Sequence, residues 1–385
     1  MDGLRILVFS AAFGAGHIKA AEALVEQVRL QAPEAVVEHL DFGEFVNKRV
    51  NALAQNIYIE MIKHTPKLWG RVYYQADKIH PDSLIQRFLN SLGRENVCDY
   101  IESYQPDLII CTYHVAAGIL AHLRRENMLN IPVATVITDY ALHGQWVHPG
   151  VDMYFVACDD VKEGLIGRGI EQGKIYITGI PVSARFEKEA DRGALRESLG
   201  LHPDKLTFLV MCGAFGVLDG VKKICTFLGE ADAFVQTVVV CGRDVRLYES
   251  LREVAEGSKN TMLCLGYSND VDRLMAASDI IITKAGGLTV TEALTKQLPL
   301  IIFKPIPGQE EENAQFLAKN GAALIAGNED ELENHVRYLL LNQEKLAGLK
   351  AAATRILPGQ GAERAVEIML DFCRNNRRPL ADSLK

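Results

Sequence analysis

The run Lys284-Ala285-Gly286-Gly287-Leu288-Thr289 has the residue types of an anion-binding turn. It follows a short β-branched run at 280–283, so a strand-to-helix turn is expected here. Glycine N–H groups at a helix start favour an oxyanion such as a diphosphate, and Lys284 could neutralise its charge. Glu292 lies one helical turn beyond Thr289, where its carboxylate could accept bonds from ribose hydroxyls. Thr289 and Glu292 also fit a capping box that stabilises the helix start, and the two interpretations are compatible.

A second polar loop, residues 307–313, follows the apolar run at 300–303. Amide and carboxylate side chains in such a loop can hydrogen-bond sugar hydroxyls, which makes Gln309, Glu310 and Asn313 candidate ligands. Glu311 and Glu312 are interpreted as an acidic first helical turn, which the helix dipole favours.

The first half of the chain has its own glycine loop, with Gly14 and Gly16 just before His17. A dinucleotide-binding loop is a minor alternative, because Lys19 stands where the third glycine belongs, although Asp41 ends the second expected strand. An imidazole with an ordinary pKa near 6.5 suits general-base work, so His17 is a candidate base. Asp139, which follows the expected strand at 133–137, is the other candidate.

Metal chemistry has weak support in this sequence. Asp270-Val271-Asp272 has the letters of a metal-binding Asp-x-Asp, but it falls at an expected helix start, where Asp270 would be an ordinary cap. His114, His143 and His148 lack a clear ligand spacing and are expected to be surface or hydrogen-bonded histidines. The eight cysteines include no Cys-x-x-Cys pair, which favours buried reduced thiols. We therefore predict no metal and no cofactor.

The elements that must position these residues form one pattern used twice. A chain of 385 residues favours two domains, and short apolar runs alternate with amphipathic stretches, as in doubly wound α/β folds. We expect domains at 1–182 and 183–360, facing a cleft, with a last helix at 361–385 crossing back to the first. Strands are expected at 5–9, 36–40, 108–111, 133–137, 153–157, 175–177, 207–211, 237–240, 261–265, 280–283 and 300–303.

Composition limits the possible partners. A net charge of −8 argues against nucleic acid and against bulk binding to anionic lipid. The first residues lack a signal-peptide pattern and no apolar run is long enough to span a bilayer, so a cytoplasmic protein is expected. One local exception is the segment at 44–74, where Lys67, Trp69 and Arg71 mix aromatic and basic groups. It could meet an anionic membrane surface peripherally, although most such helices simply pack on a domain.

Two segments, 282–293 and 307–313, resemble the bacterial processive diacylglycerol glucosyltransferases and the plant monogalactosyldiacylglycerol synthases of glycosyltransferase family 28. The N-acetylglucosaminyltransferase of peptidoglycan synthesis is a more distant relative. The resemblance covers nearly the whole chain, with Ala15 replacing a glycine of the usual first loop. Its other matching segments are 14–21, 136–139, 146–149, 178–182 and 213–218.

The resemblance implies a GT-B fold, with two Rossmann-like domains, and inverting transfer of glucose or galactose from UDP-glucose or UDP-galactose to diacylglycerol. His17 would act in catalysis and acceptor positioning. The implied donor contacts are Gly213, Phe215 and Gly216; Gly286, Gly287 and Thr289 to phosphate; Glu292 to ribose; Tyr267 and Ser268 to uracil; and Gln309, Glu310 and Asn313 to the hexose. A UDP-sugar 2-epimerase and a non-catalytic nucleotide-sugar-binding protein are the alternatives.

Overall fold

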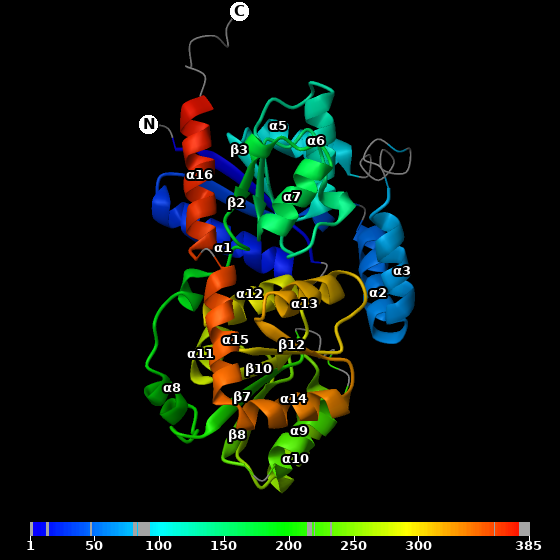
Figure 1. The fold of residues 1–385 in the computed structure, drawn as a ribbon. Coiled ribbons are helices and arrows are strands. Elements are labelled where there is room, and N and C mark those ends of the chain that lie inside the picture. Colours follow the sequence, from blue (N-terminus) through cyan, green and yellow to red (C-terminus); the bar gives the residue numbers. More distant parts are fainter. Residues whose placement is uncertain are drawn as a thin grey trace, which may run out of the picture. The chain divides into compact units, whose positions relative to one another are not determined.

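The computed structural model describes residues 3–12, 15–46, 48–79, 83, 93–213, 218, 220–231, 233–357 and 359–376. The chain forms two compact units (Figure 1). Unit 1 comprises Met1–Tyr58, Gln75–Ser183 and Gly359–Lys385, and unit 2 comprises Ile59–Tyr74 and Ala184–Pro358. The segment 59–74 therefore departs from the expected division, because it belongs with the second half of the sequence.

Unit 1 is built on a six-stranded parallel sheet in the order β2-β1-β3-β4-β5-β6. Its order reverses between β1 and β3, which is where doubly wound sheets bind ligands. The strands are β1 (Arg5–Ser10), β2 (Val36–Asp41), β3 (Leu108–Cys111), β4 (Val133–Val136), β5 (Met153–Val156) and β6 (Ile175–Ile177). Most of their side chains are buried apolar residues, as sheets covered on both faces require.

Unit 2 repeats this plan with the order β12-β11-β10-β7-β8-β9, and its reversal lies between β7 and β10. The strands are β7 (Leu206–Met211), β8 (Val235–Val240), β9 (Met262–Leu265), β10 (Ile280–Thr283), β11 (Leu300–Phe303) and β12 (Ala323–Ala326). Strand β12 was not among the strands expected from the sequence. It is a four-residue, alanine-containing strand at the edge of the sheet, so it lacks the β-branched run that marks the inner strands.

Helices flank the strands of each unit. In unit 1 they are α1 (Ala15–Gln31), α5 (Arg94–Tyr104), α6 (His114–Arg125), α7 (Asp159–Gly167) and α16 (Gly361–Asn376). In unit 2 they are α8 (Arg192–Ser198), α9 (Val221–Glu230), α10 (Val245–Gly257), α11 (Val271–Ala277), α12 (Gly287–Thr295), α13 (Gln309–Lys319), α14 (Glu329–Leu341) and α15 (Gln343–Ile356). Helices α2 (Lys48–His64) and α3 (Pro66–Ala76) carry the segment 59–74, and short 3-10 turns lie at Phe42–Glu44, Gly144–Trp146, Gln172–Lys174 and Ala184–Phe186.

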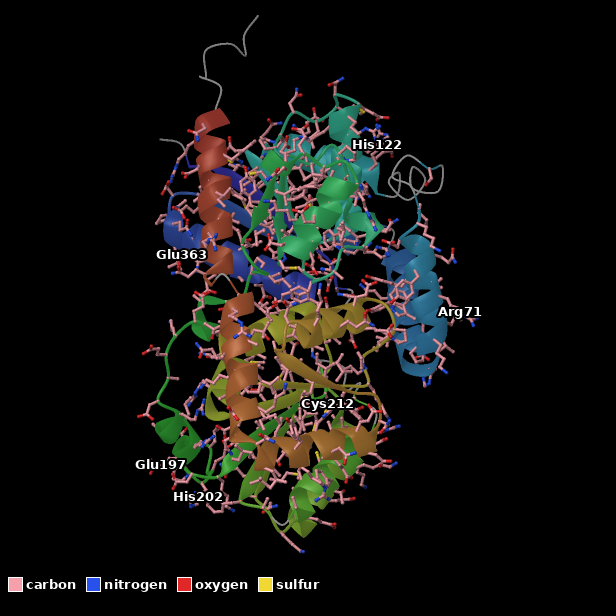
Figure 2. The ribbon with its side chains drawn as sticks, viewed as in Figure 1. Arg71, His122, Glu197, His202, Cys212 and Glu363 are labelled. Carbon is pink, nitrogen blue, oxygen red and sulfur yellow. The ribbon has the colours of Figure 1, made fainter. Side chains whose placement is uncertain are left out.

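The last helix joins the core of unit 1. Ala365, Val366, Met369 and Leu370 recur at helical spacing and are buried with the side chains of α1 and the sheet. Figure 1 shows α16 beside α1, although more than 300 residues separate them in the sequence. In unit 2, Cys212 at the end of β7 is fully buried, and burial raises its pKa, so it is an inert thiol (Figure 2). Among the described residues, no helix is long and apolar enough to cross a membrane.

Candidate functional site

The glycine run of unit 2 lies at the point where its strand order reverses. Strand β10 ends at Thr283, and α12 begins at Gly287 with Gly286 as its N-cap. A glycine cap brings no side-chain acceptor to the N–H groups of the first turn, which suits an oxyanion. The capping-box interpretation is therefore wrong, because Thr289 lies inside the helix and not at its N-cap. Glu292 is half-buried one turn later on α12.

The loop after the neighbouring strand β7 reaches the same reversal point. Gly213 has a φ of 74°, a left-handed conformation that favours glycine. Lys284 lies close enough to Cys212 for its positive charge to act on that thiol's pKa, although burial dominates. The β7 and β10 loops thus bring a glycine and a lysine together with the start of α12. Two other predicted donor residues, Phe215 and Gly216, lie outside the described residues.

Helix α13 places the predicted sugar-binding residues beside this loop. Asn313 is fully buried, and its side-chain Nδ2 donates to the carbonyl of Ala285 at 3.1 Å, so it ties α13 to the glycine run. A carboxylate oxygen of Glu310 accepts a bond from the Ile306 N–H at 3.0 Å, which stabilises the turn that leads into the helix. Gln309 is half-buried at the first position of α13.

The remaining predicted residues of unit 2 lie after β9. Tyr267 is 47% exposed and stacks under the guanidinium of Arg243 at 4.9 Å, and the Ser268 hydroxyl accepts a bond from the Asp270 N–H. Asp270 stands at the N-cap of α11 without a side-chain capping bond, which corrects the expected Asp cap. A carboxylate oxygen of Asp272 lies 3.5 Å from Nε of Arg185. Within the described ranges, no cluster of acidic, histidine or cysteine side chains has the arrangement of a metal site.

In unit 1, His17 lies in the first turn of α1, at the reversal between β1 and β3. Its Nδ1 is 3.1 Å from the Thr138 hydroxyl, and its backbone carbonyl accepts a bond from the Thr112 hydroxyl. The rings of Tyr113 and Trp146 surround it, with centroids at 5.7 Å and 6.2 Å. The imidazole is therefore held in a fixed orientation by groups at the ends of β3 and β4. Its neighbour Gly16 is in the same turn, and Gly14 lies outside the described residues.

The surroundings of His17 keep its imidazole neutral. Desolvation by the protein lowers its pKa to about 4, with a smaller opposing effect from a backbone hydrogen bond near Thr112. The ring is therefore unprotonated at neutral pH, but its lowered pKa makes it a weaker base than the ordinary imidazole expected from the sequence. The Thr138 hydroxyl, which the sequence did not single out, is the side chain that lies on Nδ1 of this ring. Asp139 itself is 7% exposed, directly after Thr138.

The other histidines of this region are not ordinary surface residues. His148 is 4% exposed, so it is not a surface histidine, and its Nε2 has no hydrogen-bond partner within the described parts of the chain. His114 begins α6, with its ring 5.5 Å from that of Trp146, and burial lowers its pKa well below the usual range. The Nδ1 of His143 accepts a bond from the Gln145 N–H.

Sequence reasoning missed Thr112, Tyr113 and Thr138 as neighbours of His17. A signal for them was present, since all three follow a strand of the parallel sheet, where ligands gather in this class of fold. The sequence also could not show that the 59–74 segment belongs to unit 2. There Pro307 and Gly308 contact Gly70 and Tyr73 of α3.

Solved structures with the same architecture define the class. The chain is similar to MurG of Acinetobacter baumannii, with a TM-score of 0.66 at 16% identity, over 96% of this chain and 99% of that one. It is also similar to HepE of Anabaena in complex with UDP-glucose, with a TM-score of 0.56 at 15% identity, over 96% and 100%. Two six-stranded parallel sheets with flanking helices are the GT-B fold of glycosyltransferases.

Sequence relatives identify the family. Residues 17–182 match the family model for monogalactosyldiacylglycerol (MGDG) synthase, and residues 207–366 match the C-terminal domain of glycosyltransferase family 28. A processive diacylglycerol beta-glucosyltransferase from Bacillus subtilis is 36% identical over 90% of this chain and 89% of its own length. The chain belongs to this family of diacylglycerol glycosyltransferases, as its sequence motifs implied. Membership favours the transferase over the epimerase and over the non-catalytic binding protein.

Proposed function

We propose that this protein transfers glucose or galactose from a UDP-sugar to diacylglycerol and forms a β-glycosyl lipid. The observation that carries the donor assignment is the glycine-capped start of α12 at the strand reversal of unit 2, with Glu292 one turn further on. The names of the relatives support the acceptor, since they are diacylglycerol glucosyltransferases. UDP-glucose bound to HepE supports the class of donor.

The proposed chemistry is a direct displacement at the anomeric carbon. The acceptor hydroxyl attacks from the face opposite UDP, the new C–O bond forms as the bond to the diphosphate breaks, and His17 takes the hydroxyl proton. The N–H groups of α12 and the ammonium of Lys284 stabilise the negative charge that develops on the leaving diphosphate. This arrangement requires no metal ion.

The function is tested by incubating the protein with radiolabelled UDP-glucose or UDP-galactose, with and without vesicles that contain diacylglycerol. Label in the lipid phase supports the transferase and identifies the hexose. A changed sugar nucleotide with no labelled lipid would instead indicate an epimerase, and an unchanged nucleotide would indicate a binding protein.

We expect Glu292→Ala to weaken UDP binding by at least about tenfold. A carboxylate that accepts bonds from ribose hydroxyls contributes roughly 1.5–3 kcal/mol per bond, and about 1.4 kcal/mol is a tenfold change in affinity. Calorimetric titration with UDP measures the effect. Glu249→Ala on α10, an exposed glutamate of the same unit, is the matched control. An unchanged UDP affinity in Glu292→Ala would show that Glu292 does not bind the ribose.

Peripheral attachment to an anionic membrane is proposed through the outward face of α3. Leu68 and Val72 are 50% and 44% exposed, and the exposed Lys67 and Arg71 lie beside them on that face (Figure 2 labels Arg71). Aliphatic groups entering the bilayer boundary, with cations on the headgroups, are the features of an interfacial helix. Trp69 is half-buried on the opposite face. We therefore assign the contact with lipid to Leu68 and Val72 instead of Trp69.

Lys67→Ala combined with Arg71→Ala is expected to reduce co-sedimentation with anionic vesicles by roughly thirtyfold in affinity, because each cation contributes about 1 kcal/mol near such a surface. Leu68→Ser with Val72→Ser should weaken it as well. The control, Lys222→Ala with Lys223→Ala on α9, removes the same charge elsewhere and should leave sedimentation unchanged. If the control loses as much binding as the α3 variants, net charge and not this face governs attachment.

A further inference from the structure

We infer that helix α3, which the chain supplies from its first half, positions the donor-sugar residues of unit 2. This inference rests on the proposed function, because it assigns Gln309 and Glu310 of α13 to the hexose. Its physical basis is a set of contacts between α3 and the turn that leads into α13, all within unit 2.

The first contact joins Gly70 to Pro307. Gly70 is the buried residue of α3, and a Cβ built on it would lie 2.6 Å from the Cβ of Pro307. Real Cβ atoms do not approach this closely, and the proline ring cannot rotate away. Glycine at position 70 therefore lets the helix backbone lie directly on the turn.

The second contact joins Tyr73 to Gly308. Gly308 has a φ of 100°, a conformation that favours glycine, and a Cβ there would lie 2.9 Å from Cγ of the Tyr73 ring. The Tyr73 ring thus packs directly against the glycine of the turn. The neighbouring Tyr74 hydroxyl donates to a carboxylate oxygen of Glu311 at 3.4 Å, a third link between the two helices.

These contacts fix the start of helix α13, which carries the residues assigned to the donor sugar. Gly308 is the N-cap of α13, so its conformation sets where Gln309 and Glu310 begin the helix. Glu310 is bonded back to Ile306 in the same turn, and Asn313 joins the next turn to Ala285 of the glycine run. A continuous chain of contacts therefore runs from α3 through the turn to the diphosphate loop. Glycine is conformationally free by itself, so the packing of α3 adds to the order that the bond between Glu310 and Ile306 gives this turn.

Gly70 and Tyr73 are positioning residues in this account, because neither is placed on the substrate. Loss of their packing should affect binding of the hexose and spare binding of UDP, which lacks it. The outward face of α3 carries the proposed lipid contact, so the same helix would serve the membrane and the donor-sugar site from opposite sides.

The experiment measures UDP and UDP-glucose affinities by calorimetry for the full chain and for the variants Gly70→Ala and Tyr73→Ala, using UDP-galactose if that is the donor. We expect both variants to bind the UDP-sugar at least about fivefold more weakly, to bind UDP as before, and to raise KM for the UDP-sugar more than they lower kcat. Vesicle sedimentation should stay unchanged, because Leu68, Val72, Lys67 and Arg71 are kept.

Gly348→Ala is the matched control, since Gly348 lies inside α15 and a Cβ there would meet no atom within 4 Å. Equal UDP-sugar affinities in the wild type and both α3 variants would overturn the inference. Loss of UDP binding in step with UDP-sugar binding would also overturn it, because that result indicates general unfolding of unit 2. Lipid labelling by the wild-type enzyme tests the proposed function separately, and it does not depend on the outcome for α3.

Discussion

His17→Ala is expected to lower kcat by about 10²–10⁴-fold while leaving UDP affinity unchanged. An alcohol is a weak nucleophile at neutral pH, and removing a positioned general base typically costs this factor. The Thr138 hydroxyl lies 3.1 Å from Nδ1 of the His17 ring and helps to hold the ring in place. Steady-state transfer to diacylglycerol and calorimetric UDP titration measure the two quantities.

His122→Ala is the control for His17→Ala, because His122 is a partly exposed histidine of the same unit, paired with Glu126 on α6 (Figure 2). It should retain full turnover. Near-normal turnover in His17→Ala would indicate that Asp139, and not His17, is the general base. Activity that is lost in EDTA and restored by Mn²⁺ would instead favour metal ligands at Asp270 and Asp272.

The lowered pKa of His17 also sets the direction of the pH dependence. Because the folded imidazole takes up a proton only near pH 4, kcat/KM should stay high below pH 6.5, where an ordinary histidine would already be charged. In the unfolded chain the same ring titrates near 6.5, so its contribution to the free energy of unfolding falls as pH drops from about 6.5 to 4. A kinetic acid limb close to 6.5 would contradict the lowered pKa of His17.

Asp279→Ala is expected to destabilise unit 2 by about 3–5 kcal/mol, the usual cost of removing one partner of a buried ion pair. One carboxylate oxygen of Asp279 lies 2.6 Å from Nη2 of Arg196 and accepts the Thr207 N–H, and Arg192 contacts the other oxygen. The Arg196 side chain is only 6% exposed, so its charge would be left buried without this partner. Hydrogen exchange of the β7 and β10 amides reports the loss.

Arg192→Ala is the matched variant for Asp279→Ala. The Arg192 side chain is 42% exposed, so its ion pair is screened by water and contributes about 0–1 kcal/mol. Asp279 lies before β10, at the opposite end from the glycine run, so UDP affinity of the folded protein should persist. A loss below about 1 kcal/mol in Asp279→Ala would mean that Arg196 finds other acceptors.

The sequence by itself determined the strands that carry both sets of candidate residues. Runs such as 108–111 and 280–283 are apolar throughout, and strands buried on both faces of a parallel sheet require this composition. The glycine runs at their ends, together with His17 and Glu292, were therefore assigned to strand ends without a structure. The resemblance to a known family then supplied the substrates, which periodicity alone cannot indicate.

Only the tertiary structure decided which side of each element meets which neighbour. Helix α3 has apolar or aromatic residues on two faces, and its amphipathic pattern does not indicate that Gly70 and Tyr73 pack inward while Leu68 and Val72 stay exposed. The start of α12 likewise depends on where β10 ends. Its N-cap is Gly286, so the capping-box pattern at Thr289 lies inside the helix and not at its N-cap. Burial lowers the pKa of His17, and the residues that surround its ring lie about 95 to 130 positions away in the sequence. Local patterns specify elements, whereas burial and contact arise only when distant segments pack together.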